Sequence, residues 1–164
     1  MRRAAGSRCA GRLVVVVRAI GARRSPSPAG LARFLRRVAS RVPPGAGSGG
    51  RFRIDVALVG DRRIRALNLR YRGKDSATDV LAFPSGERLP DGGVHLGDLA
   101  VSVATAGRQA SRRGHSPATE VRILLLHGYL HLLGRDHESD GGAMRRLERR
   151  LARELLPGAK GEGE

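Results

Sequence analysis

Cysteine, aromatic side chains and acidic residues are all scarce in this chain. The single cysteine, Cys9, excludes an intramolecular disulfide and fits a reducing compartment. Aromatic residues make up 3% of the 164 residues, which excludes a large platform for stacking nucleic-acid bases. No apolar run approaches the length of a transmembrane helix. We therefore expect a cytoplasmic protein that does not associate with a membrane.

The scarcity of acidic residues leaves a strongly basic chain. Lys and Arg number 31 against 15 Asp and Glu, so the net charge is +16, and nearly all the cations are arginines. A GC-rich genome is one source of such an arginine bias, but a field of this size still attracts polyanions. Nucleic acid is therefore the favoured partner, and a basic protein at a membrane surface is the weaker alternative.

The basic N-terminal region has two interpretations. No acidic residue precedes Asp55, which is one feature of a transit peptide. Against this, the apolar run at 13–17 is closed by Arg18 and is typical of a short buried strand. We expect residues 1–10 to be a disordered basic tail, residues 11–157 to form one domain, and residues 158–164 to form a disordered C-terminal tail.

The periodicity of apolar residues predicts alternating strands and helices, without an internal repeat or a second domain. Strands are predicted at residues 13–17, 54–58, 78–84 and 96–103. Helices are predicted from Pro28 to about residue 38, after Asp61, and at residues 104–113, 117–133 and 143–156. A chain of this length can bury a substantial core.

Local signals predict where several of these elements begin and end. Asp61 is expected to cap the helix that follows it, with Ile64, Leu67 and Leu69 facing inward. The strand at residues 78–84 is expected to end at its proline.

The helix before the histidines has a clear predicted start. Ser116 is expected to cap it, with Pro117 in its first turn and Glu120 placed favourably near its positive end. Before it, residues 85–94 are expected to form a polar loop.

Three of the five histidines lie within residues 127–137. His127 and His131 are four apart on the predicted apolar helix, so they share one face. Gly134 can adopt the left-handed conformation that ends a helix, after which the chain can bring His137 back over that face. Three neutral imidazoles would then form a zinc site with an open fourth position.

Buried core histidines are the alternative interpretation of this motif. The spacing argues against it, because it matches the metzincin pattern H-E-x-x-H-x-x-G-x-x-H. The chain departs from that pattern at Gly128, where a zinc protease carries its general-base glutamate. The motif therefore predicts a metal cage without the protease base.

Arg72 and Asp136 are the candidate catalytic side chains. Arg72 precedes a Gly-Lys-Asp turn, and its planar guanidinium suits the oxygens of a phosphate, although a solvated surface cation is the alternative. Asp136 precedes His137, where it can orient a ligand imidazole or accept a proton. A turn-forming aspartate is the alternative there.

The remaining histidines and two further aspartates have weaker signals. His95 and His115 have no partners in sequence, so we assign them no role. Asp79 and Asp98 lie in predicted strands or at their ends, where they are either structural or support the metal ligands.

Four blocks, at residues 70–75, 78–84, 96–98 and 127–137, resemble the YbeY family of bacterial rRNA maturation endoribonucleases in order and spacing. The resemblance covers residues 11–157. It implies a single α/β domain in which helices pack on a small mixed β-sheet of about four strands. It also implies a zincin-like helix motif that binds one zinc ion through three histidines, which are His127, His131 and His137.

The resemblance further implies a function and its partners. These are cleavage of single-stranded RNA at the 3′ end of maturing 16S rRNA, a part in ribosome quality control, and contact with the small ribosomal subunit. The functional arginine of the family corresponds to Arg72. The chain departs from the usual family pattern at Ala77, Ala82 and Arg135, where Pro, Ser and Tyr are commoner.

Metal-assisted hydrolysis of a phosphodiester is the expected chemistry. Zinc would lower the pKa of water, and the metal or Arg72 would stabilise charge on the phosphoryl oxygens. The general base is unidentified, and a 2′-hydroxyl of RNA is an alternative nucleophile. A metal-dependent hydrolase of another substrate and a ribosome assembly factor with structural zinc are the competing functions, and the sequence does not set the oligomeric state.

Overall fold

Strands and helices alternate through most of the chain in the computed structural model, which describes residues 12–22, 25–45, 50–135 and 141–156. The tails predicted at residues 1–10 and 158–164 lie outside the described residues, as do Asp136 and His137. The described elements are β1 (Arg12–Ala19), α1 (Pro28–Arg41), β2 (Arg51–Val59), α2 (Asp61–Arg72), β3 (Val80–Arg88), β4 (Val94–Ser102), α3 (Val103–Arg113), α4 (Pro117–Leu132) and α5 (Ala143–Leu155).

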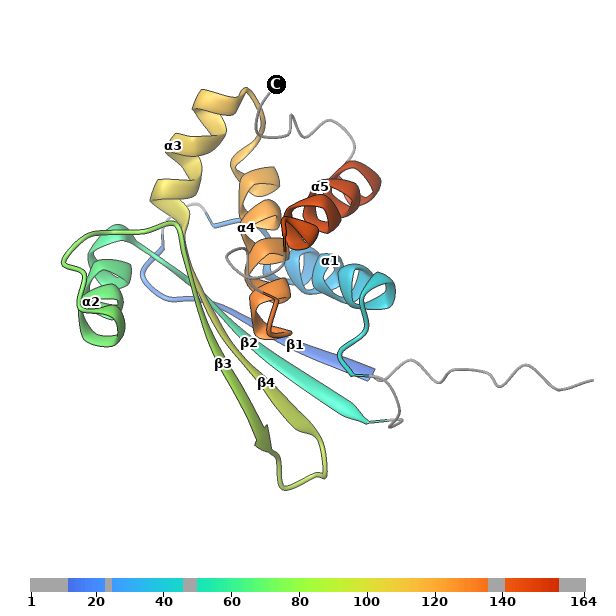
Figure 1. The fold of residues 1–164 in the computed structure, drawn as a ribbon. Coiled ribbons are helices and arrows are strands. Elements are labelled where there is room, and N and C mark those ends of the chain that lie inside the picture. Colours follow the sequence, from blue (N-terminus) through green and yellow to red (C-terminus); the bar gives the residue numbers. More distant parts are fainter. Residues whose placement is uncertain (1–11, 23–24, 46–49, 136–140, 157–164) are drawn as a thin grey trace, which may run out of the picture.

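The strands form one mixed sheet in the order β1-β2-β4-β3 (Figure 1). The pairs β1·β2 and β2·β4 are parallel, whereas the β3–β4 hairpin is antiparallel. Parallel neighbours need a crossover, and helices supply it in both cases. The expectation of a single α/β domain with a small, four-stranded mixed sheet is therefore confirmed for the described part of the chain.

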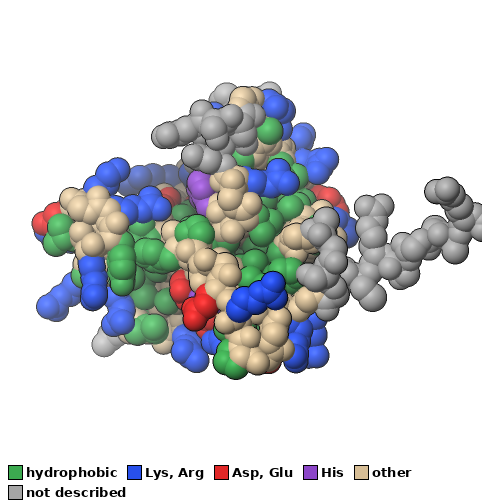
Figure 2. All heavy atoms as spheres, turned by 60° about the horizontal axis from the view of Figure 1, so that its bottom comes forward, with side chains coloured by type: hydrophobic (Ala, Val, Ile, Leu, Met, Phe, Trp, Pro, Cys, Tyr) green, Lys and Arg blue, Asp and Glu red, His purple; other side chains and the backbone are tan. Residues whose placement is uncertain are grey.

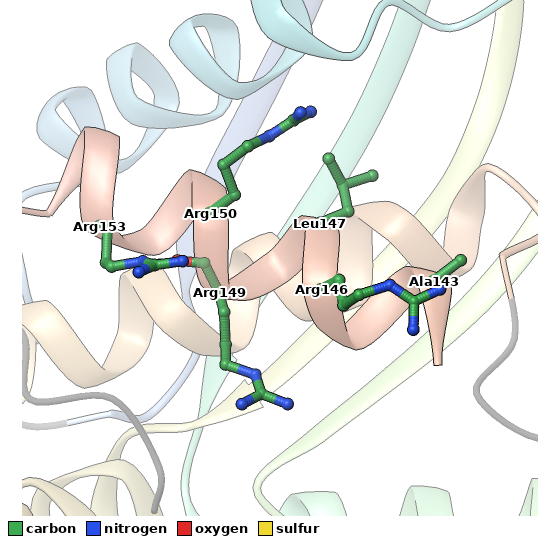
Figure 3. Close-up of a pocket in the computed structure, with 6 residues that line it drawn as sticks. All are labelled: Ala143, Arg146, Leu147, Arg149, Arg150 and Arg153. Atoms are coloured by element: carbon green, nitrogen blue, oxygen red, sulfur yellow. The ribbon is translucent and has the colours of Figure 1, made fainter. Parts of the chain in front are cut away.

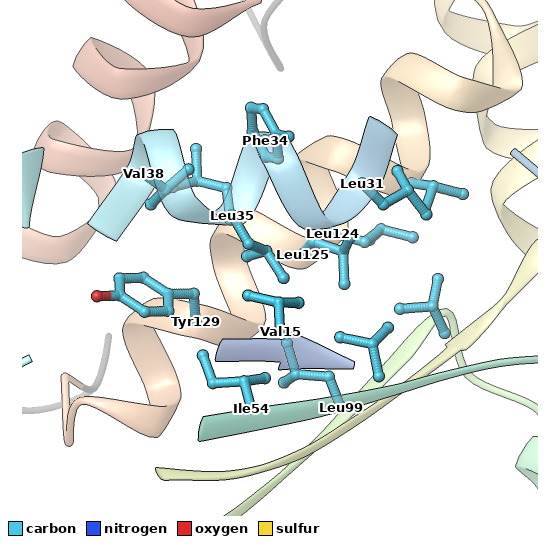
Figure 4. Close-up of a cluster of buried hydrophobic side chains, with 14 of the residues drawn as sticks. Val15, Leu31, Phe34, Leu35, Val38, Ile54, Leu99, Leu124, Leu125 and Tyr129 are labelled. Carbon is cyan, nitrogen blue, oxygen red and sulfur yellow. The ribbon is translucent and has the colours of Figure 1, made fainter. Parts of the chain in front are cut away.

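Helices α1, α4 and α5 cover one face of the sheet, whereas α2 packs on the other (Figure 1). Successive strand residues point to opposite faces, so each strand serves both layers. The larger core joins Ile54 and Leu99 of the sheet to Leu35 and Leu125 of the helices (Figure 4). The smaller core brings α2 onto the sheet through a cluster of four buried side chains, Val59, Ile64, Leu81 and Ala100.

Helix α4 begins and ends as its sequence predicts. The Ser116 hydroxyl accepts a hydrogen bond from the backbone N–H of Thr119 at 3.1 Å, and Pro117 opens the helix. Leu133 is the C-cap, and Gly134 follows with a φ of 73°. No helix among the described residues is both long enough and apolar enough to span a bilayer.

Glu120 of α4 does more than place a favourable negative charge near the start of the helix. Its side chain is fully buried, forms an ion pair with Arg113 and shares a hydrogen bond with the ring of His115. A buried carboxylate needs such partners. His115, to which the sequence assigns no role, therefore joins α3 to α4.

Two predictions about α2 are wrong. The N-cap is Gly60, and Asp61 is instead the first helical residue, whose carboxylate accepts hydrogen bonds from the hydroxyls of Ser102 and Thr105. Hydroxyl donors at the start of α3 thus replace the expected backbone donors. Leu69 does not face inward but is 50% exposed. The buried side of α2 consists of Ile64 and Asn68.

The strand β3 does not end at Pro84, and residues 85–94 are not all loop. The strand continues to Arg88, and β4 starts at Val94. Proline lacks a backbone N–H and cannot donate a hydrogen bond to a neighbouring strand. Because β3 lies at the edge of the sheet, its outer side has no neighbouring strand that needs this donor.

Gly97 lies where the register of β4 shifts. Arg53 pairs with His95 and Ile54 with Gly97, so Leu96 is an extra residue in β4. Gly97 has a φ of 142°, and a Cβ there would lie 2.1 Å from the backbone oxygen of Phe83. Only glycine fits this position.

We expect Gly97→Ala to destabilise the protein by roughly 3 kcal/mol or more, because a positive φ and a backbone clash act together. Gly107→Ala in α3 is the matched control, since an added Cβ there meets nothing within 4 Å. The control should gain about 0.5–1 kcal/mol from reduced backbone entropy. Urea unfolding of both variants measures the difference, and equal stabilities would contradict the close approach of β3 to Gly97.

The Asp61 network predicts a pH dependence of stability. Burial alone would raise the pKa of Asp61, but hydrogen bonds from Ser102, Thr105 and Arg108 outweigh it and lower the pKa below its usual value. A folded-state pKa below the unfolded value of about 3.9 means that the charged form stabilises the fold above that pH. This contribution is lost as the pH falls through the folded-state pKa.

We therefore expect Asp61→Asn to lower the free energy of unfolding by about 1–3 kcal/mol at pH 7, and by progressively less below about pH 4. Urea unfolding at a series of pH values measures this difference. Asp75→Asn, which breaks an exposed pair with Arg65, is the control and should cost much less. A deficit in Asp61→Asn that is unchanged at pH 2 would contradict the argument.

Candidate metal centre

His127 and His131 lie one turn apart on α4, and their rings meet. The two Nε2 atoms are 3.0 Å apart, and the ring centroids are 4.6 Å apart at an interplanar angle of 67°. The prediction that these two residues share a helix face is confirmed. His137 and Asp136 lie outside the described residues, so their predicted roles stay predictions.

Tyr129 and Gly128, between the two histidines, set the rotation of α4. The Tyr129 hydroxyl donates to the backbone oxygen of Val42 at 2.6 Å, which ties α4 to the end of α1. Tyr129 is fully buried, and this burial raises the pKa of its hydroxyl. With Tyr129 held in the core, the two histidines are left at the partly exposed side of the helix.

Gly128 stands where a zinc protease carries its general base, and packing explains why. A Cβ at this position would lie 2.7 Å from Cδ2 of Leu99 and 3.5 Å from Cγ2 of Val80. Leu99 is itself buried, so a glutamate there would have to displace the core beneath α4. The close contact between helix and sheet thus excludes the protease base.

Glu148 of α5 is a further residue at this site, and no local sequence pattern predicts it. Its Oε1 lies 3.3 Å from Nδ1 of His127. A carboxylate in this position favours a proton on Nδ1 and leaves the Nε2 lone pair available to a metal. Glu148 follows His127 by 21 residues on another helix, so only tertiary packing brings them together.

The donor set fits a zinc ion. Two imidazole nitrogens on a tetrahedral zinc, at about 2.0–2.1 Å each, lie roughly 3.3 Å apart, close to the separation of the two Nε2 atoms. Neutral nitrogen donors and a supporting carboxylate are also the usual chemistry of such sites. His127 and His131 can therefore hold a metal together with further ligands.

Arg72 is the last residue of α2 and is exposed. Gly73 follows in the left-handed conformation, with a φ of 67°, and turns the chain towards β3. The neighbouring Tyr71 contacts Phe83, with ring centroids 5.1 Å apart, and lies beneath the guanidinium of Arg70. Within the described ranges no carboxylate pairs with Arg72, so its guanidinium is available to a phosphate.

A second group of possible metal ligands lies on the opposite face of the sheet, at Asp55, His95 and Asp98. Nε2 of His95 is 3.4 Å from Asp55 and 3.8 Å from Asp98. Two of these residues line a groove of about 440 Å³ on this face, which comes forward in Figure 2.

Strand alternation does not predict this group, because the extra residue Leu96 turns His95 to the same face as Asp98. Its capacity for a metal is reduced by Arg53, whose guanidinium donates to both oxygens of Asp55 at 2.7 and 2.8 Å. These hydrogen bonds lower the pKa of Asp55 against the opposing effect of burial. Of the two groups, the histidines of α4 are the better metal donors.

Comparison with known proteins identifies the family. A family model described as "Endoribonuclease YbeY" matches residues 26–156. The Endoribonuclease YbeY of Solibacter usitatus is 47% identical over 123 residues, which cover 75% of this chain and 76% of that protein. The Endoribonuclease YbeY of Thermus thermophilus is 45% identical over 127 residues, which cover 76% and 91% of the two chains.

A solved structure supports the fold separately. The solution structure of TM1509 from Thermotoga maritima superposes with a TM-score of 0.58 at 23% identity, over 90% of this chain and 97% of that one. At this identity the likeness shows the fold alone. The family match and the close relatives, together with the histidine pair on α4, show that this chain is an enzyme belonging to the YbeY endoribonuclease family.

Proposed function

We propose that this chain is a zinc-dependent endoribonuclease that cuts single-stranded RNA during 16S rRNA 3′-end maturation and ribosome quality control. The observation that carries the proposal is the pair of Nε2 atoms 3.0 Å apart on α4, in a chain that belongs to an endoribonuclease family. One zinc ion would be held by His127 and His131, with His137 as the third ligand. The small ribosomal subunit in the cytoplasm is the proposed place of action.

When bound, zinc supplies a Lewis acid for a phosphoryl oxygen and lowers the pKa of water. Residues of the chain itself orient the metal ligands and bind the phosphate. Glu148 orients the His127 ring by accepting a hydrogen bond from its Nδ1–H. Arg72 presents a planar fork of donors that suits two phosphoryl oxygens and stabilises the charge that grows on them.

Asp136 is the proposed proton acceptor, or else the carboxylate that orients His137, which it precedes in sequence. Gly128 takes no part in proton transfer. The absence of a carboxylate at Gly128 distinguishes the site from that of a zinc protease, so RNA is favoured over peptide as substrate.

The surface charge supports RNA as the partner. Lys and Arg side chains are spread around the face in Figure 2, whereas acidic side chains are few there. A field of this sign steers polyanions towards the protein and raises their rate of association. Phosphodiester contacts with this surface should also make RNA binding sensitive to salt.

The metal site can be tested by removing one group at a time. We expect elemental analysis to find one zinc per wild-type chain and to find none in His131→Ala. Glu148→Gln should keep the fold but weaken zinc binding by about 10–100-fold, because it no longer accepts the Nδ1 proton as a carboxylate does. His95→Ala is the matched control and should retain the metal.

The control also separates the two candidate metal groups. Loss of zinc in His95→Ala with full retention in His131→Ala would move the metal to the group on the opposite face. Circular dichroism of each variant establishes that its fold is kept.

Arg72 can be tested by separating turnover from affinity. We expect Arg72→Ala to lower single-turnover cleavage of a 16S 3′-end transcript by about 10²–10³-fold with little change in RNA affinity, because its contacts form in the transition state. Arg72→Lys should restore only part of the rate, since an ammonium lacks the fork of donors.

Arg62→Ala, on the exposed first turn of the same helix, is the matched control and should retain the wild-type rate. A loss of affinity in Arg72→Ala with unchanged turnover would make Arg72 a docking residue. A wild-type protein that binds small subunits but cuts no RNA would favour an assembly factor over an enzyme.

A further inference from the structure

Helix α5 turns an unbroken row of arginine side chains to solvent. They are Arg145, Arg146, Arg149, Arg150 and Arg153, all exposed. At about 100° per residue they occupy an arc of roughly 140°. The opposite side of the helix buries Met144, Leu151 and Leu155. We call this row the arginine face of α5.

No carboxylate of α5 neutralises the arginine face. Glu148 is turned to α4, where it contacts His127, and Glu154 is turned to α1, where it pairs with Arg41 at 2.5 Å. In the part of the chain that the structure describes, the five arginines form no salt bridge, and they donate hydrogen bonds to the backbone oxygens of Gly141 and Arg149. Their positive charge is therefore available to a partner.

Figure 3 shows how these side chains lie. Arg149 and Arg150 extend from opposite sides of the helix in this view, whereas Arg153 lies along it towards Arg149 and Arg146 lies along it towards Ala143. These four arginines line an open hollow of about 550 Å³ with Ala143 and Leu147. Separate guanidinium groups on a rigid helix are suited to successive phosphates rather than to one small anion. From Arg146 to Arg153 the helix rises by about 10 Å, enough for two or three phosphates of a strand.

The chemistry of the helix indicates which form of nucleic acid it fits. Helix α5 carries no aromatic side chain and no amide side chain, so it cannot stack or read unpaired bases. Proteins that bind single strands rely on such stacking, whereas double-stranded RNA is recognised by its shape and backbone. An anionic membrane is a poorer fit, because the apolar side of α5 is already buried and cannot enter a bilayer.

The same helix also contributes to the metal centre. Glu148 touches His127, and Arg145, at one edge of the arginine face, lies three residues before Glu148 on the same helix. A partner bound along the arginine face is thus placed beside the histidines of α4.

We propose that the arginine face of α5 binds the phosphates of a double-helical RNA stem and so presents the adjoining single strand to the metal centre. This inference rests on the proposed function, because it assigns a docking surface to the same RNA substrate. The stem supplies the affinity, and the metal centre acts on the strand that leaves it.

The test compares two triple variants of the full chain with the same change of charge. Arg146→Gln, Arg149→Gln and Arg153→Gln remove the centre of the arginine face, and glutamine keeps helix propensity. Arg62→Gln, Arg88→Gln and Arg112→Gln remove three exposed arginines from α2, β3 and α3. Fluorescence anisotropy measures the binding of each to a stem with a single-stranded extension and to the extension alone.

We expect the α5 variant to lose at least tenfold in affinity for the stem with extension and little for the extension alone. The plot of log affinity against log salt concentration should become shallower by roughly two to three, because two or three phosphate contacts are lost. The control variant should lose less, and equally for both RNAs.

Equal losses in the two variants would overturn the proposal in favour of the overall charge. The proposal would also be overturned if the α5 variant lost as much affinity for the extension alone as for the stem with extension. A third contrary result would be a loss of binding to vesicles of anionic lipid with unchanged affinity for both RNAs. Cleavage of the extension alone at saturating concentration is measured separately. If wild type and α5 variant both cut it, the proposed function stands whatever the binding result, and if wild type cuts nothing, the proposed function fails independently of docking.

Discussion

The close packing of α4 on the sheet is the constraint on which the rest of the structure depends. Gly128 brings the helix against Leu99, and Gly97 allows Leu132 to approach the strand beneath it. Both positions lack a side chain for the same reason, since an added Cβ would meet atoms already in place. This contact determines the height and rotation of the helix, and hence the direction in which His127 and His131 point.

The two groups of possible metal ligands lie on opposite faces of the sheet. The histidines lie on the face covered by α1, α4 and α5, where Glu148 of α5 contacts His127. Asp55 and Asp98 lie on the other side, beside the groove that α2 borders. An extra residue in β4 brings His95 to that second group, so one irregularity in register produces a cluster with no counterpart in the linear sequence.

The distribution of charge follows from the packing of α5. Glu148 contacts His127 of α4 and the exposed Glu154 pairs with Arg41 of α1, so neither carboxylate of the helix pairs with its row of arginines. Net charge alone would predict attraction to any polyanion. The separation of the two signs on one helix gives that attraction a place and an orientation relative to the histidines.

Some features could be predicted from the sequence because they depend on neighbouring residues. The start of α4 at Ser116 and Pro117, the shared face of His127 and His131, and the turn at Gly134 all follow from helix geometry and capping. The strand and helix order follows from apolar periodicity in the same way. The four motif blocks indicated the family, which the family model confirms.

Other features depend on residues that are distant in sequence, and only the tertiary structure decides them. The sequence predicts Asp61 as a local helix cap, but hydroxyls at the start of α3 are better placed donors. The sequence predicts that a strand ends at Pro84, but an edge strand tolerates a proline. Glu148 at His127 and His95 beside Asp55 both join separate elements. Periodicity and capping act within a few residues, whereas these contacts arise only when helices and strands pack together.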